Sequence, residues 1–197
     1  MLKRILSLLV GCVIASFSIA CVTNSGLGCF ALTAANLSLA SITGLSLGTI
    51  SMIVDLSMLA IATYKGEGVG ITALANATIC SYLIDLFIRL LPVNTFMILG
   101  LLLIPFGWSL MGRAGLGDTA SNLLMNIVVR ESGKSIGVIR AIEECVFMLI
   151  GFIGARQYVT WFTIVLSFGL GYLLQTVYKL IKYVPTEIEH QYFIKRH

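Results

Sequence analysis

Several ionisable residues of this sequence lie inside apolar stretches, where a charge is costly and most often marks an ion or substrate pathway. Asp55 and Glu144 each lie midway along such a stretch, and Arg140 precedes Glu144 by one helical turn. Two facing carboxylates can bind a proton or a cation, because both cannot stay charged side by side without one. The structural alternative is that Arg140 neutralises Glu144 while Asp55 bonds to a neighbouring hydroxyl group.

Two further places carry polar groups at helical spacing. Asp85 and Arg89 form an i, i+4 pair near the end of another apolar stretch, where the side chains could also simply reach the membrane surface. Asn122 belongs to a polar stripe with the same spacing, which runs from Asp118 to Arg130. We therefore expect an ion or substrate pathway built from Asp55, Asp85, Asn122, Arg140 and Glu144.

The sequence contains no recognisable catalytic set. Its two histidines, His190 and His197, lie in the C-terminal tail, and HExxH and GxSxG motifs are absent. The five cysteines lie in apolar stretches without CxxC spacing, which argues against a metal site. We expect a protein that is not an enzyme and that needs neither a cofactor nor a metal.

The composition indicates an integral membrane protein. Of 197 residues, 58% are hydrophobic and 11% are charged, against about 25% charged in soluble domains. Between Arg4 and Asp55 there is no Asp, Glu, Lys or Arg. Most of the net charge of +4 comes from the two ends of the chain, so the cations suit a membrane surface, and no nucleic acid is expected as a partner.

Six stretches are long and apolar enough to form spanning helices. They are 5–22, 47–63, 71–90, 95–112, 135–153 and 158–178. The remaining segments, 24–46 and 113–134, are copies of one another. Gly26–Gly48 and Gly115–Gly137 align at an offset of 89 residues with seven identities in 23. The shared Gly-Leu-Gly turns fit close helix packing, with an anion at a helix start as the less favoured alternative.

This duplication divides the chain into a first repeat at 1–93, a second at 94–182 and a short tail at 183–197. With six spans, eleven Lys and Arg residues lie on the cytoplasmic side of the membrane and two on the outer side. With eight spans, ten lie on the cytoplasmic side and three on the outer side. The polar stripe of 118–130 favours six spanning helices, because a helix that faces lipid would not carry such a row of polar side chains. We expect an all-α membrane protein of six spans with two re-entrant or interfacial helices, in two inverted repeats of three spans.

The repeated pattern of a GLG turn, an amphipathic helix, a [TS]-G-x-S-[LI]-G turn and an apolar helix resembles the YczE/YitT group of bacterial membrane proteins. Lys134–Arg140 followed by Glu144 is similar to the group's second-half motif, and Tyr82–Asp85 to the end of its first half. The resemblance covers most of residues 5–180. Cys29-Phe-Ala and Asn122 depart from the Pro and Asp common after each Gly-x-Gly in the group. The resemblance implies a multi-pass protein of the bacterial inner membrane for which transport is presumed.

Together these observations predict a transporter or channel for a small solute or ion, with its site between the repeats and both termini in the cytoplasm. The alternative is a non-transporting accessory or ligand-binding subunit of a transporter or a membrane enzyme. The expected partners are the lipid bilayer, a small solute or ion, and a second copy or a larger complex. A polar cavity entering from one side would favour transport, and a solidly packed bundle would favour the alternative.

Overall fold

The structure, a computed structural model, describes residues 1–92, 97–167 and 169, and within these ranges it forms helices and no strands. The helices are α1 (Leu2–Asn24), α2 (Ala31–Thr43), α3 (Leu47–Tyr64), α4 (Ile71–Ala75), the π-helical segment η1 (Asn76–Cys80), α5 (Ser81–Leu90), α6 (Met97–Arg113), α7 (Ala120–Ser132), α8 (Ile136–Gly154) and the 3-10 turn η2 (Arg156–Tyr158). A further helix starts at Trp161 and is described to Ser167. The predicted apolar stretches are thus helical where they are described. The predicted tail at 183–197 lies outside the described residues.

Glycine and serine set the boundaries between the helices. Helices α2 and α7 each end at a glycine in the left-handed conformation, Gly44 with φ 74° and Gly133 with φ 65°. Glycine adopts this conformation without strain and stops the helix there. Ser46 and Ser135 follow as the N-caps of α3 and α8, a position that serine favours. The repeated [TS]-G-x-S pattern therefore encodes one helix end followed by one helix start.

The internal duplication is visible in the helix boundaries. Helices α2 and α7 begin 89 residues apart, at Ala31 and Ala120, and so do α3 and α8, at Leu47 and Ile136. The left-handed glycines recur with the same offset, as the pairs Gly26 and Gly115, Gly28 and Gly117, Gly44 and Gly133. The two halves therefore share one local fold.

The halves meet along α1 and α6, which pack closely and antiparallel. A methyl group added at Gly11 would lie 2.8 Å from the carbonyl oxygen of Gly107, and one added at Gly100 would lie 2.8 Å from that of Ser18. Gly11 is the repeat equivalent of Gly100, and Ser18 is that of Gly107. Such reciprocal contacts are those of a two-fold axis through the seam. Since the paired helices are antiparallel, the two halves run in opposite directions there.

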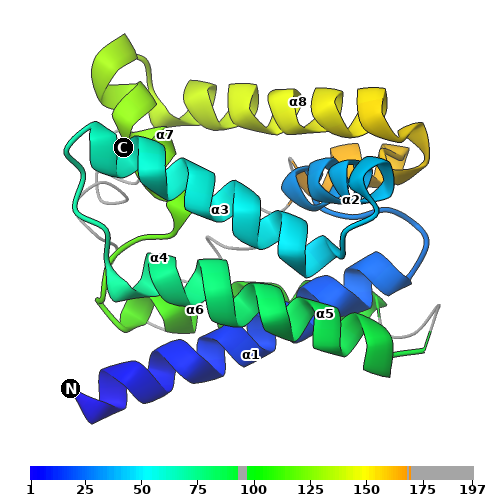
Figure 1. Ribbon diagram of the computed structural model, residues 1–197, viewed down its shortest axis with the longest axis horizontal. Coiled ribbons are helices and arrows are strands. Elements are labelled where there is room, and N and C mark those ends of the chain that lie inside the picture. The colour runs from blue at the N-terminus through cyan, green and yellow to red at the C-terminus, as the bar shows by residue number, and fades with distance from the viewer. Residues whose placement is uncertain (93–96, 168, 170–197) are drawn as a thin grey trace.

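The short helices of the two repeats lie at opposite ends of the molecule. Figure 1 shows α2 at one end of the long axis and α7 at the other. Each packs on a long helix of the other half, α2 on α8 and α7 on α3. The two halves therefore interlock, and each end of the molecule carries one short helix.

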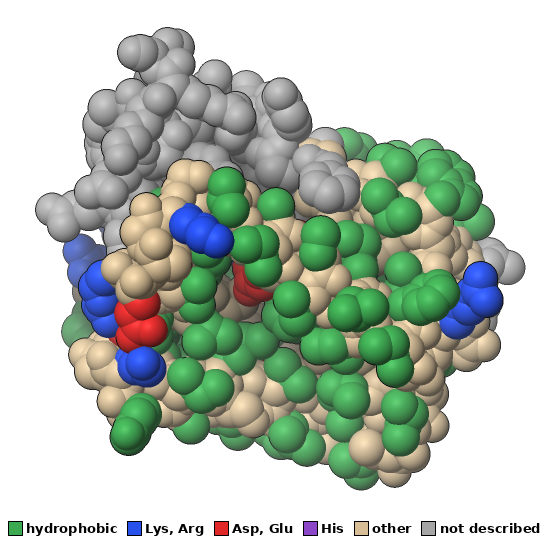
Figure 2. All heavy atoms as spheres, turned by 90° about the horizontal axis from the view of Figure 1, so that it is seen from above, with side chains coloured by type: hydrophobic (Ala, Val, Ile, Leu, Met, Phe, Trp, Pro, Cys, Tyr) green, Lys and Arg blue, Asp and Glu red, His purple; other side chains and the backbone are tan. Residues whose placement is uncertain are grey.

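Three helices are long and apolar enough to cross a membrane, judged by length and composition. They are α1, α3 and the continuous helix Ile71–Leu90, while α2 and α6 are shorter apolar helices. Large apolar side chains such as Val146, Leu149 and Ile153 are exposed on α8. Figure 2 shows apolar side chains across the middle of one face, with the cations toward its two ends. This distribution is compatible with a membrane location.

Candidate functional site: buried polar groups between the helices

Asp55 is the buried carboxylate among the described residues, with an exposed fraction of 8%. Its Oδ2 accepts a hydrogen bond of 2.9 Å from Nδ2 of Asn76. It forms no ion pair with any described residue. A buried carboxylate whose only partner is a neutral amide is costly while it is ionised. Asp55 is therefore placed where binding a proton or a cation relieves that cost.

The partner Asn76 lies at the start of η1, where the helix Ile71–Leu90 widens into π-helical geometry. Such segments are rare inside helices and are frequent at functional sites. At the far end of η1, the carbonyl oxygen of Cys80 accepts a hydrogen bond of 3.1 Å from Ser16 of α1. The widened segment is thus fixed against α1 and presents Asn76 to Asp55 on α3.

Further polar groups extend from the Asp55–Asn76 pair in both directions along the helices. Ser51 lies one turn before Asp55 on α3, and its Oγ accepts a hydrogen bond of 3.0 Å from Nδ2 of Asn36. Thr72 lies one turn before Asn76. Asn36 Oδ1 and Thr72 Oγ1 are buried without a hydrogen-bond partner. We call these five residues the polar file. Buried polar atoms normally have a hydrogen-bond partner, so the polar file has one unused hydrogen-bonding atom at each of its ends.

The equivalent carboxylate of the second repeat, Glu144, has a cation beside it. Arg140 Nε lies 3.6 Å from Glu144 Oε1, as the spacing of these residues predicts. Arg140 also pairs with Glu143, at 3.0 Å, and Ser121 of α7 donates a hydrogen bond of 2.5 Å to the same carboxylate. Glu143 and Glu144 therefore share one guanidinium group. Among the described residues no hydrogen bond or ion pair joins Asp55 to Glu144, and their facing arrangement stays a prediction.

The Asp85 carboxylate accepts hydrogen bonds from groups at the start of a neighbouring helix, α3. Its Oδ2 accepts a hydrogen bond of 2.5 Å from Ser46 Oγ, and its Oδ1 accepts one of 2.7 Å from the backbone amide of Gly48. These groups belong to the first turn of α3, whose free amides and dipole favour a negative charge. The predicted Asp85–Arg89 ion pair is absent, because the carboxylate turns to this helix start. Gly48 is required there, since an added methyl group would collide with the Ser81 carbonyl oxygen.

The polar stripe on α7 serves several contacts. Arg130 forms an ion pair with Glu67, in the loop after α3. Asn126 Oδ1 is buried without a partner. Asn122, the predicted pathway residue, is half-buried, and its side chain makes no hydrogen bond with another described residue. Burial raises the pKa of Asp118, in the turn before α7, above its ordinary value. No side-chain hydrogen bond therefore joins Asn122 to Asp55 among the described residues.

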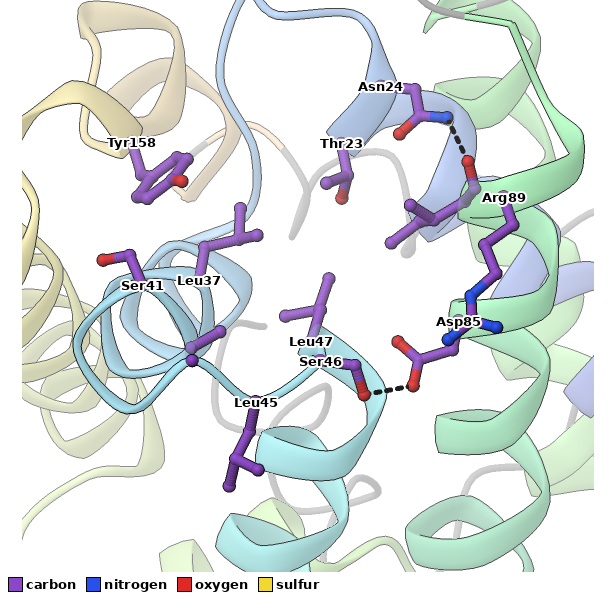
Figure 3. A pocket seen from close by; sticks show the side chains of 13 residues that line it. Thr23, Asn24, Leu37, Ser41, Leu45, Ser46, Leu47, Asp85, Arg89 and Tyr158 are labelled. Atoms are coloured by element: carbon purple, nitrogen blue, oxygen red, sulfur yellow. Dashed lines mark hydrogen bonds between the residues drawn. The ribbon is translucent and has the colours of Figure 1, made fainter.

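A pocket of about 510 Å³ lies beside the start of α3 (Figure 3). It is formed by the ends of α1, α2 and α5, the start of α3, and Tyr158 of η2. Arg89 and Asp85 lie on one wall and Tyr158 on the opposite one, with Thr23 between them. Its lining residues are Thr23, Asn24, Leu37, Ala40, Ser41, Gly44, Leu45, Ser46, Leu47, Asp85, Ile88, Arg89 and Tyr158. The sequence did not predict this pocket.

The polar-file residues that sequence reasoning missed are neutral. Asn36, Ser51, Thr72 and Asn76 carry no charge, and a search for ionisable residues in apolar stretches passes over them. Thr72 and Asn76 are nonetheless spaced i, i+4 in the apolar helix Ile71–Leu90, and that spacing could have marked them. No cluster of three or more His, Cys, Asp or Glu side chains suited to a metal occurs in the part of the chain that the structure describes.

The Gly-Leu-Gly turns have a packing role. Gly28 and Gly117 have φ values of 135° and 105°. An added methyl group at Gly28 would collide with Thr160, and one at Gly117 would come within 2.7 Å of Gly70. Each turn therefore lies against the connection that precedes the last helix of the other repeat. This geometry supports close packing as the reason for these glycines.

Comparison with known proteins gives a family and no individual relative. No curated protein and no solved structure matches the chain, and the resemblance to the YczE/YitT group stays a prediction. One family model matches twice, at residues 2–97 and at residues 92–196. The chain belongs to this family, which is described as a family of unknown function (DUF6198).

Proposed function

We propose that this protein is a proton-coupled membrane transporter for a small solute or ion and that Asp55 carries the proton. The observation that carries the proposal is the Asp55–Asn76 pair, a buried carboxylate held at 2.9 Å by a neutral amide. Ionisable groups inside membrane segments are usually retained for a use. Asp55 has no cation among the described residues to neutralise it, so a proton neutralises it in one step of the cycle.

The polar file gives this proton a route. Leu47, Ser51 and Asp55 are spaced four residues apart and share one face of α3. Leu47 lines the pocket, and Asp55 lies two turns further along, about 12 Å at 1.5 Å per residue. Ser51 lies halfway between them and is bonded to Asn36. The polar file therefore runs along α3 toward the pocket and ends at Ser51, one turn from the pocket residue Leu47, and Thr72 extends it beyond Asp55. A polar entry of this kind supports transport over the accessory-subunit alternative.

A proton fits Asp55 better than a metal cation does. Sodium and other hard cations require several oxygen ligands around the ion. Among the described residues, only Asn76 forms a hydrogen bond with the Asp55 carboxylate, and it does so through its amide nitrogen. A proton needs a single carboxylate oxygen. Arg140 lies beside Glu144 and offsets its negative charge, whereas Asp55 has no cation among the described residues, which leaves Asp55 as the exchangeable member of the two equivalent positions.

In the proposed membrane arrangement, six helices span a bacterial inner membrane, and residues 1–93 and 94–182 form inverted repeats. Two observations support this arrangement: α1 and α6 pack antiparallel, and the family model matches the chain twice. Both termini are then cytoplasmic. Reporter fusions at Met1 and His197 are expected to show the same side, and termini on opposite sides would rule out the arrangement.

The function is tested in liposomes that enclose a pH-sensitive dye. Purified protein is reconstituted, short-chain carboxylates, amino acids and sugars are added outside in turn, and internal pH is followed. The wild-type chain is expected to acidify the lumen with at least one solute class. Asp55→Asn is expected to abolish the pH change, because an amide mimics the protonated acid and cannot release a proton. Its melting temperature in detergent should stay near that of wild type.

The matched control is Glu131→Gln, which removes a carboxylate from an exposed ion pair with Lys65 and should leave the pH change intact. Wild-type proton movement in a correctly folded Asp55→Asn protein would overturn the role of Asp55. A flux that requires sodium and leaves internal pH unchanged would overturn proton coupling.

A further inference from the structure

The pocket beside α3 contains two opposite charges, Asp85 and Arg89, and neither forms an ion pair with a described residue. Both oxygens of the Asp85 carboxylate are already engaged, by Ser46 Oγ at 2.5 Å and by the Gly48 amide at 2.7 Å. Arg89 lines the same pocket and pairs with no acidic side chain of the described residues. The start of α3 thus holds the Asp85 carboxylate, and the Arg89 guanidinium group beside it is left without an ion-pair partner among the described residues.

The remaining walls combine a few polar groups with a larger apolar surface. Thr23 Oγ1 is buried without a hydrogen-bond partner, and Figure 3 shows its side chain directed into the pocket. Apolar wall is supplied by Leu37, Leu45, Leu47 and Ile88. A volume of about 510 Å³ lies within the usual range of about 300–1,000 Å³ for small-molecule sites. Such a pocket suits a small ligand with one polar end.

We propose that this pocket binds a short-chain carboxylate, with the carboxylate group at Arg89 and the hydrocarbon part against the leucine and isoleucine walls. The planar guanidinium group matches a carboxylate in a two-point contact. The Thr23 hydroxyl gains a partner when it donates to the ligand. A zwitterion is disfavoured because its ammonium group would lie against the leucine and isoleucine walls once its carboxylate is at Arg89. A dianion is disfavoured because the pocket offers a single cation.

This site deepens the proposed function and rests on it for transport, though not for binding. The anion would lie at one end of the polar file and the proton on Asp55 further along it. Moving one carboxylate together with one proton carries no net charge across the membrane. The pocket and the polar file would then be the two halves of an electroneutral symport.

Binding is measured by isothermal titration calorimetry on the purified full-length protein in detergent. The probes are butyrate, 4-aminobutyrate and 1-butanol, which share a four-carbon chain and differ in their charges. Butyrate is expected to bind, and 4-aminobutyrate and 1-butanol at least about tenfold more weakly. The alcohol loses the charge-assisted contact with Arg89, and 4-aminobutyrate places its ammonium group against the apolar walls. Arg89→Gln should weaken butyrate binding by at least about tenfold, and Arg89→Lys by less.

The matched control is Arg156→Gln. Arg156 also belongs to this end of the molecule, but its guanidinium carbon lies 5.0 Å from the centre of the Phe152 ring, and it does not line the pocket. Butyrate affinity should change less than about twofold in this variant. An equal loss in the Arg156 and Arg89 variants would overturn the site, since it would indicate general surface charge.

Three other outcomes separate the alternatives. Equal binding of 4-aminobutyrate and butyrate would overturn the choice of a simple anion. If butyrate does not bind, while nanodiscs with phosphatidylglycerol stabilise wild type more than Arg89→Gln, the site belongs to a lipid headgroup and the proposal fails. Butyrate binding with no proton movement in liposomes would instead overturn the proposed function and leave this site standing. Asp55→Asn should bind butyrate normally.

Discussion

The two repeats place a carboxylate at the same position of the same helix and surround it differently. Asp55 of the first repeat is 8% exposed and is held by the neutral amide of Asn76. Glu144 of the second repeat has a side chain that is 17% exposed and lies 3.6 Å from Arg140. One carboxylate thus has a neutral partner in the interior, and the other has a fixed cation nearer the surface.

This difference shows how a duplicated fold can divide its tasks. The backbone plan is common to both halves, from the left-handed glycines to the helix starts. The charge balance depends on side chains that differ between the copies, such as Arg140, whose repeat equivalent is the serine Ser51. A neutral hydroxyl leaves its carboxylate free to exchange a proton, whereas an arginine holds its carboxylate ionised. The shared plan and the divergent charges can be tested separately.

The largest expected effect lies where the repeats are alike. Gly11→Leu and Gly100→Leu each insert a side chain into the α1–α6 seam, where even a methyl group would lie 2.8 Å from a carbonyl oxygen. Each substitution is expected to lower the free energy of unfolding by about 3 kcal/mol, because the facing backbone cannot easily move away. The two losses should be similar, since the contacts are reciprocal. Thermal unfolding in detergent measures both.

Gly68→Ala is the control for these seam variants, because nothing lies within 4 Å of an added methyl group there. It should unfold at nearly the wild-type temperature. A large loss for Gly11→Leu with none for Gly100→Leu would contradict the two-fold character of the seam.

A smaller effect is expected where the repeats differ. Arg140→Leu removes the cation that serves both Glu143, at 3.0 Å, and Glu144, at 3.6 Å. Stranding paired buried charges costs about 3–5 kcal/mol, and with an Arg140 side chain that is 36% exposed we expect about 2 kcal/mol, since solvent screens part of the interaction. Urea or thermal unfolding of the detergent-solubilised protein measures this loss.

Compensating substitutions sharpen the interpretation. Adding Glu143→Gln and Glu144→Gln to Arg140→Leu removes the stranded charges and should restore most of the lost stability. If the triple variant is no more stable than Arg140→Leu alone, the arginine stabilises the helix by packing, and the contrast with Asp55 loses its electrostatic basis.

The sequence by itself determined the helices and the duplication. Apolar length places α1, α3 and Ile71–Leu90 where the structure has them, because helix formation in apolar surroundings depends on local length and composition. Gly44 and Gly133 mark helix ends because only glycine adopts positive φ without strain. The Arg140–Glu144 ion pair was also predictable from the sequence, because the two residues are one helical turn apart. All of these features are local along the chain.

Tertiary structure decided which helices meet and therefore which polar groups become partners. Asp85 is one turn from Arg89 but bonds to Ser46 and Gly48 of another helix. Asp55 finds Asn76, 21 positions away, only because η1 turns that amide toward α3. The pocket at Arg89 exists because the ends of several helices converge there. Spacing fixes neighbours within one helix, but the rotation and crossing of packed helices fix neighbours between them, and these depend on close contacts such as Gly48 against Ser81 that no local pattern encodes.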